Sequence, residues 1–116
     1  MSYMNQTLTD DKLDINSLAE RTGIRTQVLS EIRSFAKQYD IERVVLFGSR
    51  ARGDYHRTSD IDLAVYGGNY LLFAHDVDEY TSTLLKFDIV DMSRPMNPEL
   101  SESINSEGIA VYISLR

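Results

Sequence analysis

The sequence predicts a single α/β (α+β) domain in which helices cover a mixed sheet. Segments with apolar residues at helical spacing alternate with short runs of β-branched and aromatic residues, and glycines or a proline mark most boundaries. The composition, 42% hydrophobic and 26% charged over 116 residues, is typical of one globular domain. We expect the domain to span 14–116, after a polar, unpatterned and flexible N-terminus at 1–13.

Two helices are expected first. Residues 14–22 have Asp14 as a candidate N-cap and Gly23 as a stop signal. Residues 26–39 form an amphipathic helix, because one buried stripe collects Val28, Leu29, Ile32, Phe35, Ala36 and Tyr39.

The middle of the chain predicts a strand, a turn and a loop. Residues 41–47 are apolar on both alternating faces toward their end, as expected of a strand buried on both sides. Gly48 ends this strand, and 49–52 can form one helical turn stopped by Gly53. Residues 54–59 are a polar loop.

The second half predicts two helices and three strands. Residues 60–66 alternate as a half-buried strand does, and 70–86 carry apolar residues at helical intervals. Residues 87–92 are a third strand. A last helix begins at an Asn-Pro cap and ends at a glycine, covering 97–108, and a final strand covers 109–113.

Charge and composition exclude several classes of protein. The formal charge of -6 argues against broad binding of nucleic-acid phosphates, which needs a basic face. With no cysteine, disulfides and thiolate metal sites are impossible. The N-terminus lacks the basic start and apolar core of a signal peptide, and no apolar run is long enough to span a membrane. We expect a cytoplasmic protein.

Three pieces of sequence predict a phosphoryl-transfer site. Gly48 and Ser49 follow a buried strand, Asp60 and Asp62 open the next strand, and Asp88 lies on a third. Side chains two apart on a strand point to the same side, so Asp60 and Asp62 present two carboxylates together. Glycine lets the backbone approach a phosphate, and a helix start at Ser49 aims N–H groups at it.

Carboxylates in this arrangement suit Mg²⁺, which prefers a few carboxylates together with water and phosphate oxygens. Two such ions can stabilise the attacking and the leaving oxygen, and a third carboxylate, Asp88, would hold the ion on the nucleophile side. Asp91 points to the opposite strand face, so only one of the two can join the site. An EF-hand is excluded, because Asp62 is followed by apolar residues.

The stretch LFGSRARGDYHRTSDIDLAV resembles the nucleotidyltransferase superfamily related to DNA polymerase beta, most closely its minimal nucleotidyltransferase branch. It matches the pattern Gly-Ser, ten residues, Asp-x-Asp, and the resemblance covers roughly Val28 to Tyr112. It implies that Asp60, Asp62 and Asp88 are the catalytic, metal-binding carboxylates. It also implies that the nucleotide is bound by Gly48, Ser49, Arg50, Arg52 and Ser59.

The same resemblance implies a biological role. The minimal branch is commonly the antitoxin half of toxin-antitoxin pairs whose toxin is a HEPN-domain ribonuclease. Its members transfer AMP from ATP to a tyrosine of that toxin. The expected partners are therefore a HEPN-domain toxin and a nucleoside triphosphate, with two Mg²⁺ ions as cofactors.

Two other functions fit parts of the sequence. The chain can neutralise its partner by binding alone, with catalysis vestigial, although the complete aspartate set speaks against this. LAERTGIRTQVLSEI resembles a helix-turn-helix DNA reader, from Leu18 to Ile32. Residues 1–40 hold five Lys plus Arg and six Asp plus Glu, so no basic footprint supports DNA binding.

Overall fold

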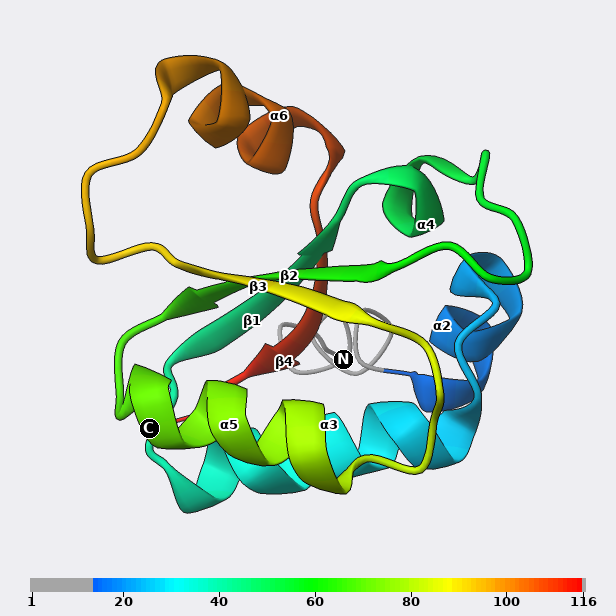
Figure 1. The fold of residues 1–116 in the computed structure, drawn as a ribbon, viewed down its shortest axis with the longest axis horizontal. Coiled ribbons are helices and arrows are strands. Elements are labelled where there is room, and N and C mark those ends of the chain that lie inside the picture. The colour runs from blue at the N-terminus through cyan, green and yellow to red at the C-terminus, as the bar shows by residue number, and fades with distance from the viewer. Residues whose placement is uncertain (1–13, 116) are drawn as a thin grey trace, which may run out of the picture.

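The computed structural model describes residues 14–115, in which a four-stranded mixed sheet is covered by helices on both faces (Figure 1). This confirms the predicted fold class. The flexibility expected of 1–13 lies outside the described residues. In chain order the elements are α2 (Ile15–Thr22), α3 (Thr26–Gln38), β1 (Arg43–Phe47), α4 (Ser49–Arg52), β2 (Ile61–Tyr66), α5 (Tyr70–Tyr80), β3 (Phe87–Asp91), α6 (Pro98–Glu107) and β4 (Ile109–Ile113).

The sheet has the strand order β3-β2-β1-β4. β1 pairs antiparallel with both β2 and β4, whereas β2 and β3 run parallel. Four of the five β1 residues are buried, which confirms the prediction of a strand covered on both faces. The parallel pair places the starts of β2 and β3 at the same end of the sheet, so that Asp62 and Asp88 are neighbours.

Helices α2, α3 and α5 cover one face of the sheet and enclose the main core. Its buried members include Leu29 and Ile32 of α3, Phe73 and Val77 of α5, and Leu63 of β2. The apolar stripe predicted for α3 therefore faces this core. Burial of each large apolar side chain stabilises the fold by about 2 kcal/mol.

Helix α6 covers the other face, where a smaller apolar cluster forms around Val45, Phe47, Ala64 and Ile104. Figure 1 shows α6 on the side of the sheet opposite α3 and α5. Because one helix covers this face, apolar side chains at its margin are only partly buried; these are Tyr66, Val90, Met92, Met96 and Leu100.

The predicted helix boundaries hold where local capping decides them. Asp14 accepts a hydrogen bond from the backbone N–H of Asn16, and Gly23 ends α2 in the left-handed conformation. Asn97 caps α6 through the N–H of Glu99, with Pro98 in the first turn.

The helix predicted over 70–86 is wrong in its second part, because α5 ends at Tyr80. Thr81 is extended, and both the backbone N–H and the hydroxyl of Ser82 donate to the carboxylate of Glu31 on α3. Leu84, an apolar residue within the predicted helix 70–86, is fully exposed. A contact with a residue 51 positions away therefore ends the helix, and local periodicity does not reveal such a contact.

Among residues 14–115, no helix combines the length and the apolar character needed to cross a membrane.

Candidate active site

The turn between β1 and α4 lies directly against a carboxylate. Gly48 has φ 75° and ψ -158°, and a Cβ atom built on it would lie 2.0 Å from Oδ2 of Asp62. Neither this φ nor this contact tolerates a side chain. Glycine is therefore required here because Asp62 occupies the space that a Cβ atom would fill. The β1–β2 register explains the proximity, since Phe47 pairs with Asp62.

Asp62 and Asp88 are direct neighbours on parallel strands, where their Cα atoms are register partners. Adjacent strands lie about 4.8 Å apart, so the two side chains stand side by side on the α6 face. Asp60 is exposed and lies one residue before β2, not within it as predicted. The negative charges of Asp60 and Asp88 nevertheless both act on Asp62.

Asp91 points away from this group, as the alternation of β3 predicts. Val90 packs in the α6-side cluster, whereas Ile89 packs in the main core with α5. The Asp91 carboxylate accepts hydrogen bonds from the N–H and hydroxyl of Ser93, and these bonds lower its pKa. Asp91 is therefore a local turn residue on the opposite face from Asp88.

The carboxylates of Asp60, Asp62 and Asp88 have no hydrogen-bond or ion-pair partner among residues 14–115. Partial burial raises the pKa of Asp62 to about 6, and the charges of Asp88 and Asp60 add to this effect while Arg52 opposes it. A half-buried, unpaired carboxylate next to two others is unfavourable in the absence of a cation. The three carboxylates thus repel one another, and this repulsion does not contribute to the stability of the fold.

No three acidic or histidine side chains among the described residues converge closely enough to hold a metal ion by themselves. The predicted triple-carboxylate metal centre is thus not formed by side chains alone. The donor set still fits Mg²⁺, because the carboxylates supply hard oxygen ligands and the missing side chain of Gly48 lets Asp62 lie directly against the β1–α4 turn. The fit to an ion depends on ligands from a phosphate and from water.

The raised pKa of Asp62 predicts a pH-dependent penalty on folding. Because the folded state binds this proton more tightly than the unfolded state, stability falls as pH rises from about 4 to about 6 and stays reduced above that. We expect Asp62→Asn to stabilise the metal-free protein at pH 7 by about 1 kcal/mol, after allowance for solvent screening, with little gain at pH 4.

Denaturant unfolding with a chelator present, at pH 4 and pH 7, measures this difference. Asp91→Asn is the matched control, because its carboxylate has a lowered pKa. Its loss should destabilise the protein at pH 7, the opposite sign. An Asp62→Asn variant less stable than wild type at pH 7 would contradict the proposed repulsion.

The short helix α4 forms as predicted, and it brings Ser49 and Arg52 to the same region. Ser49 is half-buried at the helix start, where the first N–H groups of a helix have no intrahelical partner. Arg52 is 45% exposed and pairs with Asp54 and with Glu107 at the end of α6, both at 3.3 Å. Its charge also reaches Asp62, whose pKa it lowers.

The structure does not place Arg50 and Ser59 as free phosphate ligands. The side chain of Arg50 is 1% exposed and turned into the protein, where it donates to four backbone carbonyls. The hydroxyl of Ser59 accepts from the N–H of His56, and its carbonyl accepts from Arg50. Nucleotide binding by these two residues stays a prediction. In the structure, both residues form hydrogen bonds with the loop before Asp60.

Sequence reasoning missed the partners of the two arginines. Glu107 lies 55 positions from Arg52, and Thr22, whose carbonyl accepts from Arg50, lies 28 positions upstream. No local sequence pattern predicts such pairs, because they depend on how α2, α4 and α6 pack in the folded protein.

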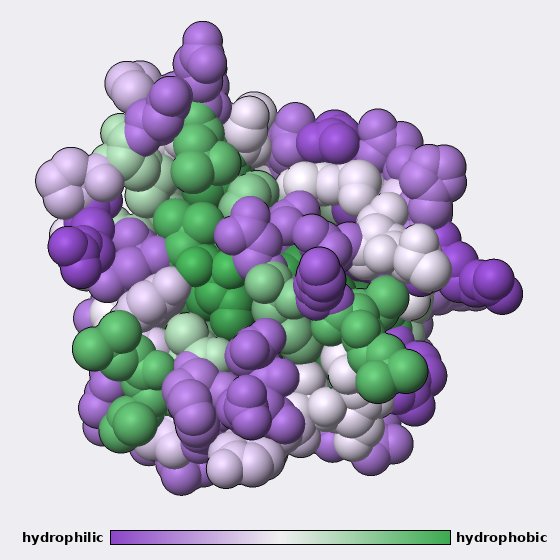
Figure 2. All heavy atoms as spheres, in the orientation of Figure 1, coloured by the Kyte–Doolittle hydropathy of each residue, from purple (hydrophilic) through white to green (hydrophobic). Residues whose placement is uncertain are grey.

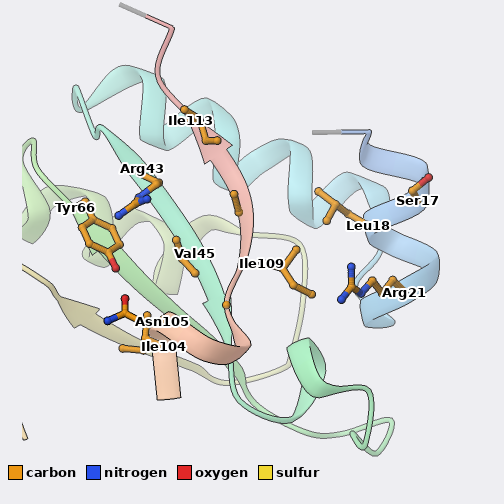
Figure 3. A pocket seen from close by; sticks show the side chains of 12 residues that line it. Ser17, Leu18, Arg21, Arg43, Val45, Tyr66, Ile104, Asn105, Ile109 and Ile113 are labelled. Atoms are coloured by element: carbon orange, nitrogen blue, oxygen red, sulfur yellow. The ribbon is translucent and has the colours of Figure 1, made fainter. Parts of the chain in front are cut away.

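A groove of about 450 Å³ lies away from the carboxylates (Figure 3). Residues of α2, β1, β4 and α6 line it, including Arg21, Arg43, Ile109 and Asn105. None of the predicted site residues contributes to its wall.

The start of α3, which a helix-turn-helix protein would insert into DNA, is already occupied. Arg25 donates to the carbonyl of Ser82, and Gln27 donates to the hydroxyl of Ser82 and to Glu31. Since α2 and α3 also cover the sheet, the two helices serve the fold. These contacts argue against insertion of α3 into DNA.

A glycine–serine turn beside strand carboxylates on a mixed sheet is the arrangement expected of an enzyme that transfers nucleotides. Residues 30–115 match the family described as "Polymerase beta, Nucleotidyltransferase". The chain belongs to this family and is a nucleotidyltransferase.

Known relatives agree with this family. Two proteins of Methanocaldococcus jannaschii, both named "Putative protein adenylyltransferase", are 44% identical over 50 residues and 30% identical over 99 residues. The first match covers 43% of this chain and 48% of that protein, and the second covers 75% and 99%.

A structure described as a toxin-antitoxin with AMP-PNP is similar to this fold, with a TM-score of 0.60 and 21% identity over 75% of this chain and 74% of that chain. A mutant of the toxin-antitoxin MntA-HpeT gives a TM-score of 0.57 and 20% identity over 74% and 72% of the two chains. At these identities the likeness concerns the fold.

Proposed function

We propose that this nucleotidyltransferase is an antitoxin that moves AMP from ATP to a tyrosine hydroxyl of a cognate HEPN-domain ribonuclease toxin and thereby neutralises it, in a Mg²⁺-dependent reaction. The observation that carries the proposal is the unpaired carboxylate group of Asp60, Asp62 and Asp88 next to the Gly48 turn. The names of the relatives and the toxin-antitoxin structures support the AMP donor and the type of partner.

The nucleotide is proposed to bind where the β1–α4 turn faces the carboxylates. Backbone N–H groups and the hydroxyl of Ser49 would hold the departing pyrophosphate, and Arg52 would leave its exposed ion pairs to contact the triphosphate. Asp60, Asp62 and Asp88 would hold Mg²⁺, which supplies charge neutralisation at the phosphate oxygens.

The transfer needs an activated tyrosine, because a tyrosine hydroxyl has a pKa near 10. Asp88 is proposed to accept the hydroxyl proton on a carboxylate oxygen while the tyrosine oxygen forms a bond to the α-phosphorus. The bond between the α-phosphorus and the bridging oxygen breaks, and pyrophosphate leaves. Asp88 is suited to this role, because it is exposed at the start of an edge strand and an incoming side chain can reach it.

A protein acceptor is consistent with the surface next to Asp88. Figure 2 shows an apolar area where α6 and β3 meet, and the partly buried side chains of this region include Val90, Met92, Met96 and Leu100. Asp88 and Val90 lie on the same face of β3. The net charge of -6 favours a basic partner.

The test is to purify the chain with its proposed HEPN-domain partner and to measure the mass of that partner by intact and peptide mass spectrometry. With ATP and Mg²⁺ we expect AMP on a tyrosine and loss of ribonuclease activity, and neither change when a chelator is added. The masking alternative predicts that the toxin is silenced with its mass unchanged. Modification of another residue type would refute the tyrosine assignment, and failure to bind the toxin would refute the antitoxin role.

A further inference from the structure

Arg50 has an environment unlike that of a phosphate ligand. It is the one charged residue among the buried residues of 14–115, with a side chain 1% exposed. Its guanidinium lies 4.9 Å from the ring centroid of Tyr55, which covers it. A buried cation is tolerated only when its donors are satisfied, and here the acceptors are all backbone carbonyls.

Three of these carbonyls belong to the loop that leads into β2. Arg50 donates to the carbonyls of His56 at 3.4 Å, Arg57 at 3.0 Å and Ser59 at 3.0 Å. The carbonyl of Ser59 belongs to the peptide group that joins Ser59 to Asp60. The guanidinium therefore holds the backbone directly before the first carboxylate of the site.

The fourth carbonyl fastens the loop to the rest of the fold. Arg50 donates to the carbonyl of Thr22, the last residue of α2, at 3.0 Å. Carbonyls at a helix end lack intrahelical partners, so this bond also satisfies α2. Figure 1 shows the segment after α4 passing beside α2. The guanidinium group of Arg50 therefore connects α4 to both α2 and the loop.

The other hydrogen bonds observed for residues 56–59 lie within the loop itself. Within it, Ser59 and His56 exchange two hydrogen bonds, from the Ser59 N–H to the His56 carbonyl and from the His56 N–H to the Ser59 hydroxyl. Residues 56–58 are exposed, so apolar packing contributes little to their order. Just before the loop, the ring of Tyr55 lies against Gly23 at the end of α2. Within residues 56–59, the hydrogen bonds that anchor the loop to the described interior are those of Arg50.

We infer that Arg50 is a positioning residue, which sets the place of the Asp60 carboxylate by holding the loop 56–59 against α2, and that it does not bind the nucleotide. Arg52, two residues further on the same helix, is exposed and its charge acts on Asp62, so it is the arginine suited to phosphate. The expected effect on AMP transfer rests on the proposed function, whereas the anchoring of the loop by Arg50 does not.

Matched Arg→Lys substitutions separate the two arginines. Lysine keeps the charge but lacks the planar fork and cannot reach all four carbonyls. For Arg50→Lys we expect amide hydrogen exchange in 55–61 to rise at least about tenfold, because the loop opens locally. We expect kcat for AMP transfer to fall by about 10- to 100-fold, since a carboxylate misplaced by about 1 Å loses that much.

Binding of Mg²⁺·AMP-PNP, followed by calorimetry, is the other readout. It should stay within about threefold of wild type in Arg50→Lys and weaken by about tenfold in Arg52→Lys, which keeps normal loop exchange. Affinity lost in Arg50→Lys to the same degree as in Arg52→Lys would make Arg50 a nucleotide ligand and overturn the inference. Unchanged loop exchange in Arg50→Lys would also overturn it.

Two results would require a different readout: absence of AMP transfer by the wild-type protein, and misfolding of Arg50→Lys. If wild-type protein transfers no AMP, the proposed function fails, while the exchange measurement still decides the role of Arg50. If Arg50→Lys does not fold, the wild-type amides of His56 and Ser59 decide: exchange as slow as in β1 supports the inference, and exchange as fast as at a free surface loop refutes it.

Discussion

Replacing either Asp60 or Asp62 by asparagine is expected to reduce AMP transfer by at least about a thousandfold while the protein stays folded. Both variants keep the size of the side chain and remove one negative charge from the group that would hold Mg²⁺. Asp62 is half-buried among like charges, so its replacement relieves repulsion in the metal-free state. Activity and stability are thus expected to change in opposite directions for Asp62→Asn.

Single-turnover transfer to the toxin and thermal unfolding, measured on the same preparations, test this prediction. The control is Asp54→Asn, whose carboxylate pairs with Arg52 at the surface and which we do not place among the metal ligands. It should keep activity within about tenfold of wild type. Full activity in Asp60→Asn or Asp62→Asn would contradict the assignment of that residue to the catalytic group.

Replacing Asp88 by asparagine is expected to slow transfer by at least about a hundredfold but to leave ATP·Mg²⁺ affinity within a fewfold of wild type. Asp60 and Asp62 remain in that variant to hold the ion on the phosphate side, so the nucleotide still binds. The step that is lost is activation of the tyrosine hydroxyl. Asp88 is exposed on β3 beside Asp62, which suits contact with an incoming acceptor.

Asp91→Asn is the matched control on the same strand, because its carboxylate bonds Ser93 on the opposite face. We expect its transfer rate to stay within about threefold of wild type. Equal loss of transfer in both variants would point to a general effect on β3. Loss of ATP binding in Asp88→Asn alone would place Asp88 on the phosphate side and refute this division of roles.

Much of the site could be predicted because each of its parts is local in the sequence. The alternation of β2 orients Asp62, and the alternation of β3 separates Asp88 from Asp91. Gly48 is recognised as a turn residue, and its contact with Asp62 shows why the position admits no side chain. The alternating pattern predicts Asp60 within the strand, whereas Asp60 lies one residue outside it.

The arginines were predicted less well, because their roles depend on distant partners. Arg50 and Arg52 are two residues apart in one short helix, and the sequence treats them as equivalent basic neighbours of a phosphate site. In the structure Arg50 reaches the end of α2 and the loop before β2, whereas Arg52 reaches the end of α6. Only the packing of α4 decides which guanidinium is buried.

The sequence by itself determined the order of helices and strands, the caps of α2 and α6, and the carboxylates that face one side of the sheet, because period and capping are properties of neighbouring residues. The tertiary structure decided where α5 ends, since Glu31 holds Ser82 from another helix. It also decided that Asp62 and Asp88 are register partners and that Arg50 supports the loop before Asp60. Strand register and the burial of a long side chain depend on contacts between residues far apart in the chain.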